Sequence, residues 1–274
     1  MFIFAQNYQF MKNILVPIGS SENAKNTLQY AIDFAELIKA DIYVYRAYNV
    51  VGKAGTIINL DEIIQRETSL YVRTVINSTD RKSVSVKMIS AKGNAIDSIK
   101  SIDKKLGIDF IILGPRSNSV DETVFLGNTS GSIIKQTEIP ALIVPEGYSF
   151  KPVSNILTAF RSGIIKKQDV LKPLKAFVEI FNAKVNLLLV KTPGHTEEDL
   201  VLDQQLKEIQ SSLTVTENAT TYQGVLTHFL TKNPDMLCVF RRKRGFFKKL
   251  LEKNTISKSE FDCKVPLLVL SGKQ

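Results

Sequence analysis

Short apolar runs alternate with longer amphipathic segments along this chain. Residues 13–18 form an apolar run, and residues 23–38 carry apolar side chains every three or four positions, as on one face of a helix. The same alternation predicts further strands over 41–48, 84–89, 109–113 and 141–144, and helices over 61–76, 94–106 and about 129–137. Because neighbouring parallel strands need long connections, this order indicates a doubly wound α/β sheet of five parallel strands.

The second half of the chain repeats the first. Residues 109–144 and 235–270 carry similar blocks at the same spacing, so that each position has a partner 126 residues later, with Asn128 on Asn254. The second copy has about 16 residues fewer between its second and fourth strands, and its segment 191–203 is predicted to start as a loop. The duplication predicts two domains, 11–148 and 152–274, each large enough to bury a core of its own.

The composition is that of a globular protein, with 274 residues, 44% of them hydrophobic and 23% charged. No apolar run approaches the roughly 20 residues that a membrane helix needs. Residues 1–10 lack the basic start and the cleavage site of a signal peptide, and Met11 is an alternative start. Cys238 and Cys263 have neither metal-ligand nor redox spacing. We therefore expect a cytoplasmic protein.

The positive charge is concentrated in the second half. The net charge is +9, and the residues from Lys151 onward hold 20 Lys and Arg against 12 Asp and Glu, a net of +8. The densest run is Arg241–Lys249, which can meet an anionic surface such as nucleic acid or lipid headgroups. The alternative is a solvated loop running into a helix, with apolar side chains packed inward at Phe246, Phe247, Leu250 and Leu251.

Ligands of doubly wound sheets bind where strands end and helices begin. Two turns of the first half qualify, at residues 17–21 and 114–117, and a helix is predicted to start close to residues 127–130. Their glycines let the backbone approach a phosphate closely, the helix start donates N–H groups and hydroxyls, and Arg116 adds a positive charge. The alternative is that Gly114 only ends a strand, the hydroxyls only cap a helix, and nothing is bound.

The blocks at these positions resemble the universal stress protein family, whose nucleotide-binding members carry Gly-x2-Gly-x9-Gly-Ser/Thr after the fourth strand. The motif positions and residues 139–145 carry the likeness, and the motif positions are occupied by Gly114, Ser117, Gly127 and Asn128. The resemblance extends over both halves. It implies two tandem, doubly wound, five-stranded parallel-sheet domains of the adenine nucleotide alpha hydrolase-like fold, arranged as a pseudo-twofold pair.

The resemblance implies an ATP or AMP site in the first domain only. Gly114 and Gly127 match the family's ligand positions. Gly19 stands in place of the acid that meets the adenine end, Ser117 in place of the second glycine, and Asn128 in place of the Ser/Thr. The nucleotide-binding residues that we expect are Pro17, Ile18, Gly19, Ala47, Gly114, Arg116, Ser117, Gly127, Asn128, Thr129 and Ser130.

The second domain departs from the family at the same positions. Phe240, Lys243 and Lys253 replace the three glycines, and Arg161 stands at the position of Gly19. We expect this second site to be empty, because a bulky Phe240 blocks the close approach of the backbone to a phosphate. The alternative is that the basic side chains bind phosphate by charge.

In this family the last strand lies at a sheet edge, and two copies pair through it. The resemblance therefore implies that the strands Ala141–Val144 and Pro266–Leu270 meet across an internal pseudo-twofold axis, with Pro145–Val153 as the linker. One chain then imitates a family dimer, and a further homodimer of chains stays open.

No motif indicates a nucleophile, a catalytic triad or a metal site. His195 and His228 have no ligand-spaced neighbours, and Asp121–Glu122 is typical of a solvated loop. We therefore expect a non-enzymatic stress-response protein, in which a nucleotide orders the loop Arg116–Leu126 and alters a surface presented to a protein partner. The alternatives are a ligand-free scaffold that binds an anionic partner through the basic second domain, and a slow nucleotide hydrolase.

Overall fold

The computed structural model describes residues 11–20, 22–49, 60–116, 123–166, 168–241, 255–258 and 261–271. The first half contains β1 (Asn13–Pro17), α1 (Ala24–Ile38), β2 (Asp41–Tyr48), α2 (Leu60–Asn77), β3 (Val86–Lys92), α3 (Ala95–Leu106), β4 (Phe110–Leu113), β5 (Val124–Leu126), α4 (Asn128–Gln136) and β6 (Ala141–Ile143). The second half contains β7 (Asn155–Phe160), the 3₁₀ turn η1 (Gln168–Leu171), α5 (Lys172–Phe181), β8 (Lys184–Lys191), the 3₁₀ turn η2 (Glu197–Leu200), α6 (Gln204–Ile209), β9 (Ser212–Glu217), α7 (Thr221–Lys232), β10 (Met236–Phe240), β11 (Ile256–Ser257) and β12 (Leu267–Leu270).

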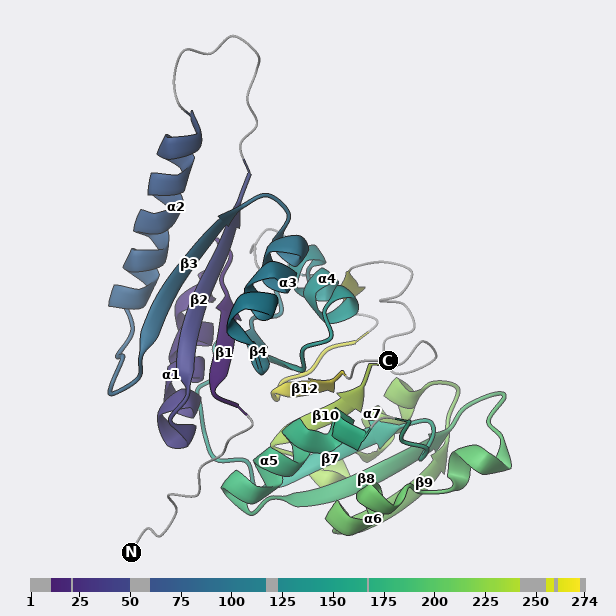
Figure 1. Ribbon diagram of the computed structural model, residues 1–274. Coiled ribbons are helices and arrows are strands. Elements are labelled where there is room, and N and C mark those ends of the chain that lie inside the picture. Colours follow the sequence, from purple (N-terminus) through teal and green to yellow (C-terminus); the bar gives the residue numbers. More distant parts are fainter. Residues whose placement is uncertain are drawn as a thin grey trace, which may run out of the picture.

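The main sheet has ten strands, in the order β3-β2-β1-β4-β6-β12-β10-β7-β8-β9. Each half contributes five strands, and the order in the second half mirrors that in the first. All pairs within each half are parallel, whereas β6 and β12 are antiparallel, with Leu142 opposite Leu268. Figure 1 shows the yellow β12 between the teal end of the first half and the green second half. The predicted α/β class, a doubly wound pair of five-stranded parallel sheets, is confirmed.

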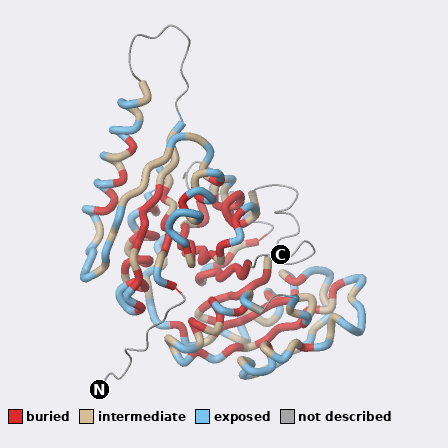
Figure 2. Tube along the Cα trace, in the orientation of Figure 1, coloured by how far each residue is buried: buried red, intermediate tan, exposed pale blue. Residues whose placement is uncertain are grey.

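Helices cover both faces of this sheet because the central strands are apolar on both faces. Every residue of β4, β6, β10 and β12 is buried, as is typical of strands between two helical layers. One core cluster packs the sheet against α1, α2, α5 and α6, and the other against α3, α4 and α7. Figure 2 shows the buried residues as a red band through the middle of the molecule.

The two halves share one core. Phe34 of α1 stacks on Phe177 of α5 with ring centroids 5.2 Å apart, and both rings pack against Phe110 of β4. The antiparallel β6–β12 pair continues the sheet across the same boundary. A large apolar surface of each half is therefore covered by the other.

Two details of the first half differ from the sequence prediction. β3 covers Val86–Lys92 instead of 84–89, because it follows its parallel partner β2 until Lys92 lies opposite Tyr48. Part of the predicted loop Arg116–Leu126 is the strand β5, which pairs antiparallel with β11 of the second half. A strand this short, paired with a segment far away in sequence, leaves no periodic signal.

The second half is a shortened copy. The 18-residue α2 has only the 6-residue α6 as its counterpart. Lys191 still belongs to β8, and the predicted loop after it contains η2, closed by a capping box between Thr196 and Asp199. The prediction that the second half repeats α4 at 126 residues' distance is wrong for the described residues there, because Ile256–Ser257 form a strand. These residues pair with β5 instead of forming a helix.

None of the helices in the described ranges combines the length and the apolar character that a membrane span requires.

Candidate functional site

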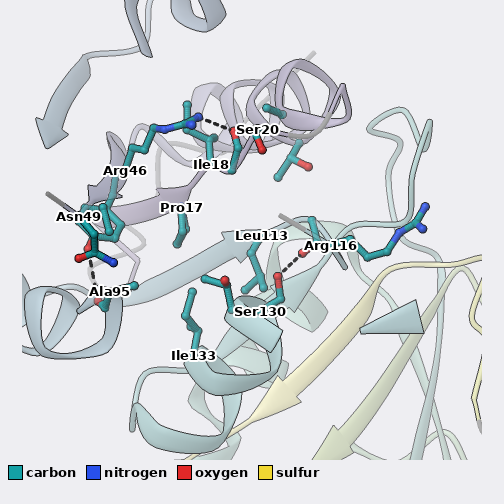
Figure 3. Close-up of a pocket in the computed structure, with 17 residues that line it drawn as sticks. Pro17, Ile18, Ser20, Arg46, Asn49, Ala95, Leu113, Arg116, Ser130 and Ile133 are labelled. Atoms are coloured by element: carbon teal, nitrogen blue, oxygen red, sulfur yellow. Dashed lines mark hydrogen bonds between the residues drawn. The ribbon is translucent and has the colours of Figure 1, made fainter. Parts of the chain in front are cut away.

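A cavity of about 260 Å³ lies at the carboxyl ends of β1, β2 and β4 (Figure 3). The chain leaves β1 toward β2 on one side and returns to β4 on the other, so this is the point where the strand order reverses. Ligands of open α/β sheets bind at such a point. The residues that line the cavity are Pro17, Ile18, Gly19, Ser20, Ala24, Thr27, Tyr45, Arg46, Ala47, Asn49, Ala95, Leu113, Gly114, Arg116, Thr129, Ser130 and Ile133.

Three helices begin at this cavity, and two of them begin without a side-chain cap. The N-cap residues of α1 and α4, Asn23 and Gly127, make no side-chain cap hydrogen bond. In α3, by contrast, the Asn94 side chain accepts from the N–H groups of Ile96 and Asp97. The first N–H groups of a helix lack intrahelical partners and attract anions. The walls formed by α1 and α4 therefore suit a negatively charged ligand.

Gly114 packs closely against the first turn of α1. A Cβ atom at this position would lie 3.0 Å from Thr27 Oγ1 and 3.1 Å from Asn23 Nδ2. The carbonyl of Gly114 accepts a hydrogen bond from Ser130 Oγ at 2.9 Å, which ties the turn after β4 to the start of α4. The sequence predicts that a phosphate lies close to the backbone at Gly114. In the structure, the first turn of α1 lies there instead.

Gly127 has no comparable steric requirement. Its φ of −76° is open to any residue, and a Cβ atom would make an ordinary contact of 3.5 Å with Arg116 Cα. Its N–H donates to the carbonyl of Pro115 at 2.9 Å, which holds the N-terminus of α4 against the turn after β4. A side chain at Gly127 can therefore be accommodated.

The expected charge of Arg116 is paired within the protein. Its Nε and Nη2 donate to the two carboxylate oxygens of Glu146 at 3.0 and 2.6 Å, and its side chain is only 8% exposed. Figure 3 shows the guanidinium directed away from the other labelled residues. The prediction that Arg116 brings a positive charge to the ligand is corrected accordingly, since Glu146 neutralises that charge.

Arg46, which the sequence analysis did not predict as a site residue, lies at the opposite wall of the cavity. Arg46 donates from Nη1 to the carbonyl of Gly19 at 2.8 Å, and its guanidinium carbon lies 4.0 Å from the centre of the Tyr71 ring. The Tyr71 hydroxyl donates to the same carbonyl at 2.8 Å. A cation therefore stands beside the position where the family resemblance implies an acid.

The parallel pairing of β1 with β2 is the signal that could have identified Arg46. Pro17 lies opposite Tyr45, so the residues that follow the two strands share one wall of the cavity. The lining described above contains two arginines but no aspartate, glutamate, histidine or cysteine.

The structure brings most of the predicted site residues together. Those that line the cavity are Pro17, Ile18, Gly19, Ala47, Gly114, Arg116, Thr129 and Ser130. Gly127 is the N-cap of α4 and Asn128 is exposed on its first turn, so neither is among the lining residues. Ser117 lies outside the described residues. Ser20, from the predicted turn 17–21, also lines the cavity, and the lining residues that the sequence reading missed are Ala24, Thr27, Tyr45, Arg46, Asn49, Ala95, Leu113 and Ile133.

The equivalent place in the second half is filled by an aromatic side chain. Phe240, at the end of β10, is 4% exposed and packs edge-on against Phe160 with ring centroids 6.1 Å apart. Lys243 and Lys253 lie outside the described residues. Phe240 thus belongs to the core at the position that Gly114 occupies in the first half.

The turn after β7 is also covered by the chain itself. Gly163 donates its N–H to the carbonyl of Asp199 at 2.9 Å and accepts from the N–H of Asp203 at 3.0 Å. A Cβ atom at Gly163 would overlap the carbonyl of Val201. Arg161, the counterpart of Gly19, donates to the carbonyl of Gly194 in the same loop. The loop after β8 therefore lies over the turn after β7, whose counterpart in the first half borders the cavity.

The structure describes only Arg241 of the basic run Arg241–Lys249. Arg241 is half-buried, and its Nη1 donates to the carbonyls of Ile134 and Lys135 at the end of α4. This contradicts the interpretation of Arg241 as part of a solvated or anion-binding surface. Its positive charge lies at a helix C-terminus of the first half, where cations are favourable.

Within the described ranges, no cluster of three or more His, Cys, Asp or Glu could hold a metal ion. Both cysteines are buried. Burial raises the pKa of the Cys238 thiol, and burial also raises the pKa of the Cys263 thiol, to about 12.

Comparisons with known proteins agree on one family. Residues 11–145 match the model of the universal stress protein family. A universal stress protein of Methanocaldococcus jannaschii is 22% identical over 138 residues, covering 48% of this chain and 81% of the relative. Universal stress protein G of Escherichia coli O157:H7 is 24% identical over 142 residues, covering 48% of this chain and 98% of the relative.

The likeness in fold extends over both halves. The crystal structure of a universal stress protein from Archaeoglobus fulgidus DSM 4304 aligns with 98% of this chain and 99% of its own, with a TM-score of 0.70 and 19% identity. The sequence matches, by contrast, each cover 48% of the chain.

Proposed function

Because residues 11–145 belong to the universal stress protein family, we propose that the chain is a tandem stress-response protein that binds one adenine nucleotide, ATP or AMP, in the cavity of its first half. The two proposed domains span residues 11–148 and 152–274. The second is a degenerate copy without a ligand.

The observation that supports this proposal most is the start of two uncapped helices at a cavity whose lining, among the described residues, contains no carboxylate. Backbone N–H groups at the starts of α1 and α4 attract an anion. The hydroxyls of Thr129 and Ser130 lie at the same wall. No lining side chain carries a negative charge that would repel a phosphate.

The opposite end of the cavity suits the base. Pro17, Ile18 and Ala47 offer apolar surface for a purine ring. The volume of about 260 Å³ is slightly below the range of about 300–1,000 Å³ that is usual for small-molecule sites. We therefore place the nucleoside inside the cavity and the phosphates at the start of α4.

The proposed activity is binding and not catalysis. A hydrolase needs a group that activates water, and the lining residues include no carboxylate, imidazole or thiol to do so. In the proposed mechanism the nucleotide acts on the loop Arg116–Leu126, which ends in β5 and of which residues 117–122 lie outside the described residues. The bound nucleotide thereby changes a surface that this loop presents to a protein partner.

The proposal of a single site rests on the contrast between Gly114 and Phe240. A glycine leaves room at the end of β4, whereas the buried ring of Phe240 fills the corresponding place at the end of β10. We therefore expect one nucleotide per chain.

The test is a calorimetric titration of ATP and AMP into the full-length protein after bound nucleotide has been removed, with Gly127→Asp as the control. Aspartate is a favourable N-cap residue, so this change keeps α4 while adding a negative charge at its N-terminus, beside the proposed position of the phosphates. Micromolar binding with a stoichiometry near one in the wild type, lost in Gly127→Asp, is the expected result.

Absence of heat at millimolar ligand in the folded wild type would exclude the nucleotide proposal. The ligand-free scaffold would then become the leading hypothesis. Charge reversal at Arg242 and Arg244 would test it through loss of a salt-sensitive interaction with an anionic partner. Arg241 is unsuitable for this test, because its guanidinium contacts α4.

A further inference from the structure

The second half contacts the ligand-bearing helix of the first half at both of its ends. α4 lines the cavity through Thr129 and Ser130 at its N-terminus. Arg241 of the second half contacts its C-terminus, and β11 pairs with the strand β5 that directly precedes it. Arg241 and β11, which flank residues 242–254 outside the described ranges, therefore contact α4 or the strand directly before it.

At the C-terminus, Arg241 completes the hydrogen bonding of the last turn. The N–H and the hydroxyl of Thr137 donate to the carbonyl of Ile133 at 3.0 and 2.8 Å. The next two carbonyls, those of Ile134 and Lys135, accept from Arg241 at 3.2 and 2.7 Å. The last carbonyls of a helix lack intrahelical partners, and a cation there is favourable.

The partial burial of Arg241 is energetically unfavourable for a charged group. This indicates that the side chain has a structural role. Burial lowers the pKa of Arg241, and the nearby charge of Glu138 only partly opposes this effect. The half-buried guanidinium is thus partly shielded from water and faces two carbonyls of the other half. A side chain that only provided solubility would extend into solvent.

At the N-terminus, the contact is a short antiparallel pair. Leu126 lies opposite Ile256 and both are buried, and the N–H of Lys258 donates to the carbonyl of Thr123 at 2.6 Å. Phe125 packs edge-on against Phe261 of the second half, with ring centroids 4.7 Å apart. Leu126 immediately precedes the N-cap residue of α4, so this pair contacts the chain directly before the helix.

We propose that the second half, which has no ligand of its own, holds α4 in the position at which the first half binds its nucleotide, with Arg241 as a positioning residue. This inference rests on the proposed function. Backbone N–H groups stabilise a phosphate only at short distance and in good alignment, so a shift of α4 weakens binding. By linkage, a ligand on α4 also strengthens the contacts that hold it.

The experiment compares full-length Arg241→Met with Arg161→Met. Arg161 is a matched control, because it is also half-buried and also donates to a carbonyl, but its partner Gly194 lies in the second half. Amide exchange of residues 131–137 is measured without ligand, and the affinity for AMP is measured by calorimetry. Arg241→Met is expected to speed exchange in α4 and to weaken AMP binding, each by about tenfold. Arg161→Met should change neither.

A third variant separates positioning from general destabilisation. Arg241→Lys keeps the cation and N–H donors at the helix end, so it should recover part of the affinity and of the exchange protection. Equal exchange in α4 of the Arg241→Met and Arg161→Met proteins would overturn the proposal. Faster exchange with unchanged AMP affinity would overturn the positioning role. A wild type that binds no AMP rejects the proposed function, while the exchange rates still decide whether the second half holds α4.

Discussion

The two halves differ at the carboxyl end of their fourth strands, β4 in the first half and β10 in the second. After β4 the chain turns at Gly114, and the space beyond it is a cavity lined by the starts of helices. After β10 the chain carries Phe240, whose ring is buried against Phe160, and no helix equivalent to α4 occurs among the described residues that follow. The comparison teaches that this sheet does not depend on an open cavity at this place, because an aromatic side chain can fill it.

The halves also differ in how their outer strands are covered. The 18-residue α2 packs over β3, whereas the 6-residue α6 leaves Leu213 and Val215 of β9 exposed. On α7, Leu226 and Leu230 are exposed where α3 has Lys100 and Lys104. The second half has therefore lost helical cover as well as its cavity, and what it retains is the surface that contacts the first half.

The largest expected effect comes from removing the aromatic ring that fills the second site. Phe240→Ala should lower the free energy of unfolding by about 3–5 kcal/mol, because it leaves a cavity in a packed core. The measurement is urea denaturation, with the nucleotide stoichiometry determined in parallel. We expect one nucleotide per chain before and after the change. A second bound nucleotide in Phe240→Ala would show that the ring alone closes the second site.

The reciprocal change in the first half should be smaller. Gly114→Ala places a Cβ atom against Thr27 and Asn23, which are held by a hydrogen bond to each other. The expected loss is about 1–2 kcal/mol, at the lower end of the cost of overpacking. Gly127→Ala is the control, because its Cβ atom would make only ordinary contacts. Equal losses in the two variants would contradict the role assigned to Gly114.

A third prediction uses the location of both cysteines in the second half. Burial keeps the Cys263 thiol neutral, with its pKa raised to about 12, whereas an unfolded thiol ionises near pH 8.5. The unfolded state therefore loses its proton first, and the free energy of unfolding falls as pH rises above about 8.5, by up to about 1.4 kcal/mol per pH unit for each buried thiol.

The check is urea denaturation of the wild type and Cys263→Ala between pH 8 and 10. The variant should show a shallower decline, because one titrating group has been removed. Identical slopes would mean that Cys263 is accessible to water in the folded protein. The two proteins differ only at Cys263, so the difference between their slopes reports on this thiol.

The smallest effect is expected at the uncovered face of α7. Leu230→Lys restores the residue type that α3 carries at the equivalent position, and Leu230 is 89% exposed. The change in the free energy of unfolding should stay within about 0.5 kcal/mol. Val225→Lys on the buried face is the control, with a large loss of stability because it would bury a charge. A loss above about 1 kcal/mol in Leu230→Lys would indicate that this face is covered in solution.

The sequence by itself determined the class of the fold, the repeat and the edge of the sheet at which the cavity lies. Alternation of apolar and polar positions is a local signal, and it located helices such as α1 and strands such as β2 to within a residue. The spacing of the glycines also marked the turn at Gly114 and the start of α4. The helices, strands and turns named here depend only on residues close together along the chain.

Only the tertiary structure decided which side chains surround the cavity and which are engaged elsewhere. Arg46 reaches the site because β1 and β2 pair in parallel, and Arg116 is neutralised because Glu146 follows β6. Arg241 meets the carbonyls of α4 because β6 and β12 join the halves. Partners separated by 27 to 107 positions leave no periodic trace in the sequence, since their distances are set by strand order and register.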